Sequence, residues 1–116
     1  MVAHIWYPAF DEERKPASLS HNVVTGLLRE ELGYDGLIMT DAMDMNAVDM
    51  FVPFSEAVVR AIEAGVDMLA LGPSIGRDAA QPALEAVVAA VEQGRISEDR
   101  LDESLRESTD RLIAQA

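Results

Sequence analysis

The sequence contains no cysteine, which excludes a disulfide framework and thiolate chemistry. It lacks any apolar run that reaches the ~18 residues of a membrane-spanning helix. Its first residues show neither the basic region nor the long apolar core of a signal peptide. The two histidines stand in different contexts and show no ligand spacing, so no metal site is expected. None of these absences identifies a compartment.

Basic residues are also scarce. The chain has 9 Lys and Arg against 21 Asp and Glu, which gives a net charge of -12. Nucleic acids and anionic membranes are bound through basic surfaces that neutralise phosphates, so neither is expected as a partner. The acidic residues are spread along the chain and indicate a solvated surface.

What is present is the composition of a folded domain. The 116 residues are 49% hydrophobic and 26% charged, which favours one globular unit over a disordered chain.

Short apolar stretches alternate with segments of helical spacing. Residues 1–6, 36–41 and 67–71 have the pattern of short buried strands. Helices are predicted from Ser18 or Ser20 to Gly33, over 55–65 and 79–91, and after a cap at Ser97. In the last helix, four apolar side chains are expected to face inward: Leu101, Leu105, Leu112 and Ile113.

This alternation predicts an α/β fold of parallel βαβ units. Three units are too few to close a barrel, since a complete (β/α)₈ barrel takes roughly 250 residues. Composition and periodicity alone leave two possibilities open, a small open sheet and a piece of a larger barrel.

Asp41 directly follows the apolar stretch at 36–41, at the carboxyl end of a predicted strand. Ligands of parallel α/β folds bind at that end, where a carboxylate can act as a nucleophile. An isolated Asp at a strand end is as often a cap for the following turn, so position alone does not decide its role.

The residues around Asp41 distinguish between these two roles. Residues 34–45 read as an aromatic residue with Asp and Gly, an apolar stretch, the pair Thr40-Asp41, and a short loop that ends at Met45. This string resembles the nucleophile signature of glycoside hydrolase family 3. The resemblance implies that Asp41 is the catalytic nucleophile. Asp44, in the same loop, is interpreted as a hydrogen-bonding residue of that loop.

The resemblance covers nearly the whole chain, including residues 1–9, 16–20, 27–33, 64–69 and 94–104, and is closest to the β-N-acetylglucosaminidase branch of the family. It implies a partial (β/α)₈ TIM barrel made of the last three βα units plus a C-terminal helix. Residues 1–116 are then the C-terminal portion of the family's N-terminal-type catalytic barrel. His4, at the end of its own predicted strand, is a candidate substrate-binding residue, with a packed histidine as the alternative.

The implied activity is a retaining glycoside hydrolase that acts on terminal β-linked N-acetylglucosamine, with a carbohydrate substrate and no cofactor. Activity on β-glucosides or β-xylosides is the alternative within the family. The acid/base motifs of the family do not occur in this sequence, so the chain alone is expected to be inactive.

A competing hypothesis is that the chain is a catalytically incomplete fragment or subunit. In the barrel interpretation, the outer strands at 1–6 and 67–71 leave open edges, and self-association through these edges is expected.

Overall fold

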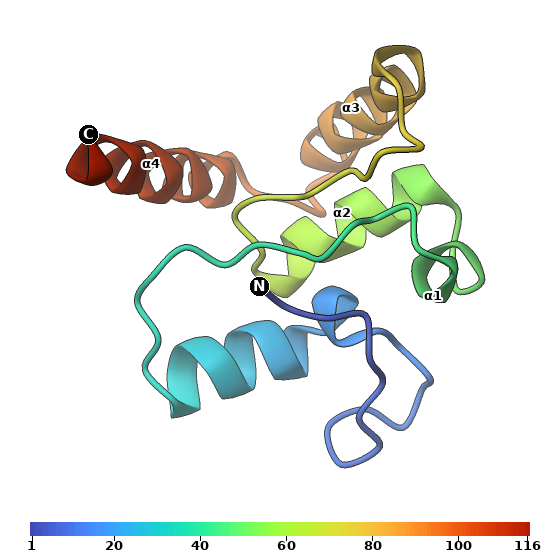
Figure 1. Ribbon diagram of the computed structural model, residues 1–116, viewed down its shortest axis with the longest axis horizontal. Coiled ribbons are helices and arrows are strands. Elements are labelled where there is room, and N and C mark those ends of the chain that lie inside the picture. The colour runs from blue at the N-terminus through green and yellow to red at the C-terminus, as the bar shows by residue number, and fades with distance from the viewer.

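The structure, a computed structural model, describes residues 1–116. Its helical elements are a short 3₁₀ helix η1 (Ala17–Leu19), a π-helix η2 (Asn22–Glu31), and the α-helices α1 (Asn46–Asp49), α2 (Phe54–Ala64), α3 (Arg77–Glu92) and α4 (Glu98–Gln115). Figure 1 shows α2 near the middle of the molecule, with α3 and α4 extending from it toward two sides.

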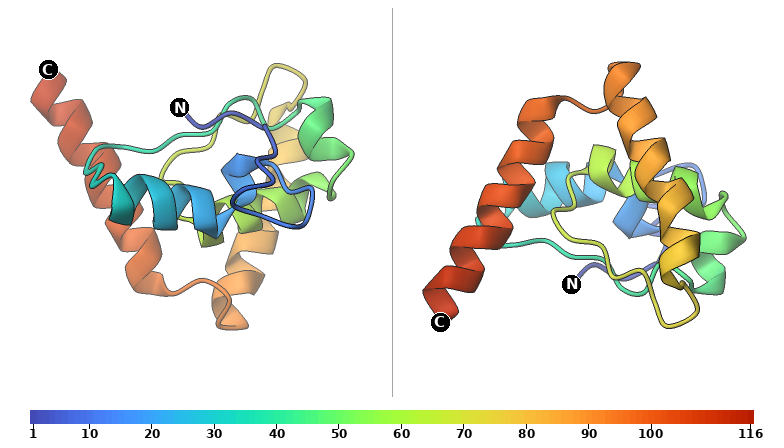
Figure 2. Two further views of the ribbon diagram at one scale, coloured as in Figure 1. Left: turned by 90° about the horizontal axis from the view of Figure 1, so that it is seen from below. Right: turned by 90° about the horizontal axis from the view of Figure 1, so that it is seen from above.

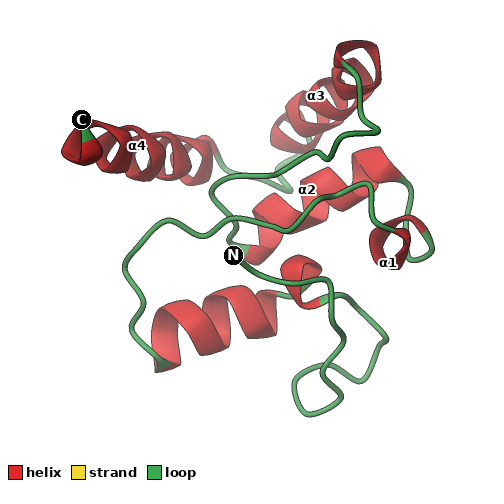
Figure 3. Ribbon diagram, in the orientation of Figure 1, coloured by secondary structure: helices red, strands yellow, loops and turns green.

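The predicted partial (β/α)₈ barrel is wrong for this structure, which is helical and contains no strand (Figure 3). The three segments predicted as strands are extended. They meet only in two isolated parallel bridges, one between Val2 and Thr40 and one between Met39 and Met68. Self-association through open strand edges therefore has no strand to act through.

Side chains stop one of these bridges from growing into a ladder, because they take amides that would continue it. On one side of the bridge between Met39 and Met68, the N–H of Ile38 donates to Oδ2 of Asp67 at 3.0 Å. On the other side, the N–H of Ala70 donates to Oγ1 of Thr40 at 3.1 Å. This bridge is therefore confined to one pair of residues.

Helix α2 organises the core because it is buried on two faces. One face packs against η1, η2 and the extended segment that contains Ile38. The opposite face carries Val58, Val59 and Ile62, which pack against Ala83 and Ala90 of α3. The bounds predicted for this helix, residues 55–65, agree with the observed helix to one residue at each end.

The C-terminus of α2 requires a glycine. Gly65 has φ of +113°, a left-handed conformation that is costly for residues with a Cβ. An added Cβ would also lie 2.5 Å from Oγ1 of Thr25. That hydroxyl donates to the carbonyl of Ala64 at 2.6 Å, so η2 caps the end of α2.

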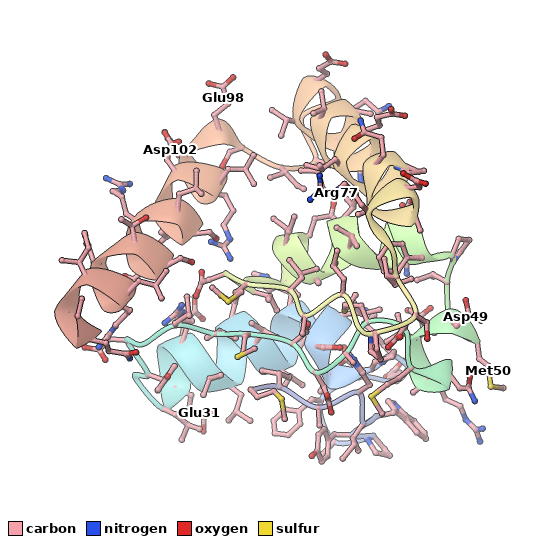
Figure 4. The ribbon with its side chains drawn as sticks, turned by 45° about the horizontal axis from the view of Figure 1, so that its top comes forward. Glu31, Asp49, Met50, Arg77, Glu98 and Asp102 are labelled. Atoms are coloured by element: carbon pink, nitrogen blue, oxygen red, sulfur yellow. The ribbon has the colours of Figure 1, made fainter.

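Helix α4 begins as predicted, but only the first of its four predicted apolar side chains is partly buried, since Leu101 packs against the core beside α3. The Oγ of Ser97 accepts the N–H of Arg100 at 3.1 Å, which is the predicted cap. However, Leu105, Leu112 and Ile113 are 64–68% exposed, so the expectation that they face inward is wrong. The reason is the path of α4, which leads away from the body after its first turns (Figure 2). Glu98 and Asp102 project from its outer side (Figure 4).

The start of α4 is attached to the body through one buried carboxylate. The side chain of Asp67 is 1% exposed and lies 2.5 Å from Nη2 of Arg29 and 3.3 Å from Nη1 of Arg100. It also accepts the hydroxyl of Ser104 at 3.2 Å. Together with its bond to Ile38, this carboxylate connects η2, the central extended segment and α4.

A second ion cluster joins α2 to the turn after α3. Arg95 lies 2.9 Å from Glu56 and 3.0 Å from Glu63. Hydrogen bonds from Arg95 and Arg60 lower the pKa of Glu56 to about 2. Because the lowered pKa favours the folded state above the ordinary pKa of 4.5, this contribution to stability is lost as the pH falls from about 4.5 toward about 2.

We predict that Asp67→Asn lowers the free energy of unfolding by about 3 kcal/mol, since it leaves two partly buried arginines without their carboxylate. Urea denaturation followed by circular dichroism measures this change. Asp35→Asn is the matched control, because Asp35 is 99% exposed and lies 3.8 Å from Arg111. The control should change stability by less than about 0.5 kcal/mol. Equal losses in the two variants would show that the Asp67 cluster does not hold the fold.

Candidate active site

Asp41 is the last residue of the central extended segment, residues 36–41, and lies next to the bridge with Val2. Its own N–H still donates to the carbonyl of Val2 at 3.0 Å. Its side chain is partly exposed, and Oδ1 accepts the N–H of Ala42 at 2.8 Å. Oδ2 makes no hydrogen bond within the chain. The carboxylate is thus oriented through one oxygen and has the other free to react.

The backbone after Asp41 is fixed from a second side. The N–H of Met43 donates to the carbonyl of Ala70 at 2.8 Å, and the side chain of Met43 is 1% exposed within the core. Two residues after Asp41, the chain is therefore fixed both through the backbone and through the side chain of Met43. Such restraint favours a reactive group held in one geometry.

The ring of His4 is directed toward the same turn. His4 is buried, and its Nε2 lies 2.9 Å from the carbonyl oxygen of Ala42, the residue that follows Asp41. Its Nδ1 lies 2.6 Å from Oγ of Ser18. The structure therefore brings the two residues predicted for the site, His4 and Asp41, to opposite sides of Ala42.

Asp44 joins this turn to the loop after residue 71. Its Oδ2 accepts the N–H of Ser74 at 2.8 Å, which agrees with its interpretation as a loop residue. This backbone bond, and next a bond with the Ser74 side chain, hold the pKa of Asp44 below its ordinary value. Gly72 makes the approach possible, because a Cβ there would lie 2.0 Å from Oδ1 of Asp44.

A cavity of about 190 Å³ lies beside Asp44, with Met43, Phe54 and Ser74 among its lining residues. Asp41 does not line it, and its volume is below that of ordinary ligand pockets. No group of three or more His, Cys, Asp or Glu side chains is placed to hold a metal ion. None of the helices combines the length and the apolar character needed to cross a bilayer.

Sequence reasoning considered Ser18 only as a possible start of a helix and missed its contact with His4. It also missed the hydroxyl of Thr40, which accepts the N–H of Ala70. Ser18 is wholly buried between the apolar Ala17 and Leu19, and it contacts His4. A serine inside a short apolar motif was the available signal, because a buried hydroxyl needs a partner. The partner itself, 14 residues away, could not be read from the sequence.

The sequence model of the glycosyl hydrolase family 3 N-terminal domain matches residues 1–110. The chain belongs to glycoside hydrolase family 3. Because the match is to the N-terminal domain of the family, the chain is part of that domain and is not a C-terminal fragment of the family's proteins. Its place at the C-terminal end within that domain stays a prediction.

Characterised relatives agree with this membership. The chain is 33% identical to the β-hexosaminidase A of Pseudoalteromonas piscicida, over 90% of the chain and 20% of that protein. It is 31% identical to a β-N-acetylglucosaminidase/β-glucosidase of Cellulomonas fimi, over 90% of the chain and 19% of that protein. The chain thus spans about a fifth of the length of these relatives.

A solved family 3 structure has a similar backbone. The β-N-acetylglucosaminidase from Paenibacillus sp. str. FPU-7 is 48% identical and superposes with a TM-score of 0.77, over 86% of the chain and 19% of that protein. The arrangement of helices and extended segments described above is therefore one that a solved family 3 protein also contains.

We predict that Gly72→Ala separates Asp44 from Ser74, since the new Cβ meets the carboxylate and Gly72 has φ of +97°. The pKa of Asp44 should rise toward its ordinary value, and stability should fall by about 1–3 kcal/mol. Carboxyl titration by NMR and urea denaturation measure the two effects. Gly76→Ala is the control, because its Cβ would meet nothing within 4 Å and its φ is −74°. An unchanged pKa of Asp44 in Gly72→Ala would contradict the proposed contact.

Proposed function

We propose that residues 1–116 supply the nucleophile-bearing portion of the family's N-terminal domain, within a retaining glycoside hydrolase. The carboxylate of Asp41 attacks the anomeric carbon, and the glycosidic C–O bond breaks. The leaving oxygen takes a proton from an acid that this chain does not provide. Water then hydrolyses the glycosyl ester and regenerates Asp41.

The observation that carries this proposal is the free oxygen of Asp41 within a matched motif. The string at 34–45 lies inside the residues that match family 3. Within it, Asp41 keeps one oxygen on the N–H of Ala42 and the other without a partner. Asp44 also accepts one backbone N–H, that of Ser74, but this bond joins it to another loop. An oriented oxygen is therefore present in both carboxylates, and the place of Asp41 in the Thr40-Asp41 pair of the motif supports it over Asp44.

The substrate class that we propose is a terminal β-linked N-acetylglucosamine. Support comes from the names of the relatives, since the Paenibacillus protein is a β-N-acetylglucosaminidase and the Pseudoalteromonas protein is a β-hexosaminidase. β-Glucosides are the second candidate, favoured by the double name of the Cellulomonas relative. Activity on β-xylosides stays a prediction from the sequence. The sequence also predicts a substrate-binding role for His4, which the contacts of both ring nitrogens with Ser18 and Ala42 do not favour.

In the full-length protein, we predict that Asp41→Ala lowers kcat/KM on nitrophenyl N-acetylglucosaminide by several orders of magnitude, because no other group replaces the nucleophile. Asp44→Ala is the matched control, three residues away in the same turn, and should lose much less. Steady-state kinetics on this substrate and on the nitrophenyl glucoside provide both measurements and rank the two sugars. Equal losses in the two variants would mean that the nucleophile has been assigned wrongly.

Residues 1–116 alone are predicted to show no turnover above background. A retaining glycosidase needs a second group to protonate the leaving oxygen, and the family's acid/base motifs are absent from this sequence. The assay compares the folded chain with the full-length protein at equal concentration. Turnover by the chain that is lost in its Asp41→Ala variant would show that residues 1–116 contain both groups.

A further inference from the structure

The imidazole of His4 bridges a buried hydroxyl and the turn that follows Asp41. A carbonyl oxygen only accepts hydrogen bonds, so the 2.9 Å contact with Ala42 requires that Nε2 carries the proton. In the neutral ring, Nδ1 then accepts the hydroxyl of Ser18 at 2.6 Å. Both nitrogens of a buried ring are engaged, which fixes the tautomer and the orientation of the imidazole.

The hydroxyl at the far end of this bridge belongs to a rigid part of the fold. Ser18 is 0% exposed and lies in η1, which packs against α2. The N–H of Ala17 donates to the carbonyl of Ile5 at 2.8 Å, so η1 is attached to the segment that carries His4. Ser18 therefore fixes the ring to the core.

The other end of the bridge holds the residue whose N–H orients the carboxylate. The carbonyl of Ala42 is held by His4, and the N–H of Ala42 donates to Oδ1 of Asp41 at 2.8 Å. These two groups lie in successive peptide planes that meet at the Cα of Ala42, and the N–H of Met43, in the same plane as the carbonyl, donates to Ala70. The contact between His4 and Ala42 therefore restrains the backbone of Ala42 directly on the C-terminal side of the N–H that orients Asp41.

We propose that His4 is a positioning residue: with Ser18, it holds Ala42 so that Asp41 faces the substrate, and it does not itself touch the sugar. This proposal rests on the proposed function of Asp41. It differs from a substrate-binding role for His4, in which a ring nitrogen would have to leave Ser18 or Ala42 in order to reach the sugar.

Two variants of the full-length protein separate the two roles. The amide nitrogen of Gln in His4→Gln lies near the position of Nε2 and can still donate to Ala42. The shorter side chain of His4→Asn reaches only toward Ser18. We expect His4→Asn to lower kcat by up to about 100-fold with KM changed less than about 2-fold, because a misplaced reacting group costs rate. His4→Gln should retain most of kcat.

Three results would overturn the positioning role. An increase in KM with unchanged kcat in both variants would indicate contact with the sugar. Equal losses of kcat in both, with equal decreases in Tm, would indicate a merely structural role. Wild-type rates in both variants, while Asp41→Ala is inactive, would refute the role of His4 and leave the proposed function intact.

The tautomer of His4 can be measured on the unmodified 116-residue chain, so this test does not depend on the folding of a variant. Nitrogen-15 NMR of the imidazole should show a protonated Nε2 and an unprotonated Nδ1. A ring protonated at Nδ1 alone, or one that exchanges rapidly between tautomers, would contradict the bridge. If the bridge is seen but Asp41→Ala remains active, the proposed function fails while the contact between His4 and Ala42 stands.

Discussion

This fold depends on the carboxylate of Asp67, which has almost no exposure to water. It has to keep its cationic and hydrogen-bonding partners if the fold is to persist. Taking such a charge out of water costs several kcal/mol unless cations and donors surround it. Here Arg29 and Arg100 supply the charge, and the N–H of Ile38 completes the set. These partners come from η2, the start of α4 and the central extended segment, so the solvation of one charge determines how three parts of the chain meet.

The same carboxylate fixes one end of the segment that carries the candidate nucleophile. Asp67 holds Ile38, and Val2, Ala70 and His4 hold the backbone from Asp41 onward. Between these ends the segment is bonded through its backbone to a neighbour on each side. A carboxylate at the end of such a segment can move little, and a reacting group gains rate from being held in that way.

The sequence predicts the parts of this structure that depend on local chemistry. Helix bounds around α2 and the cap at Ser97 follow from spacing and from glycine and serine positions. The role of Asp41 as nucleophile stays a prediction from its motif. The pairing of the central segment with residues 67–71 stays limited to one bridge because the side chains of Asp67 and Thr40 accept the backbone amides of Ile38 and Ala70, and periodicity does not predict such bonds. Likewise, helical spacing identifies the apolar face of α4, but only the path of the chain shows that Leu105 and Leu112 lie in solvent.

The central claim is that Asp41 forms a covalent bond to the sugar, and its most direct test is the capture of that bond. The full-length protein would be incubated with an activated fluorinated glycoside that forms the glycosyl ester quickly and hydrolyses it slowly. Digestion and tandem mass spectrometry then identify the labelled residue. We predict one added sugar, on Asp41. A label on Asp44 or on another carboxylate, or turnover without any adduct, would contradict this account.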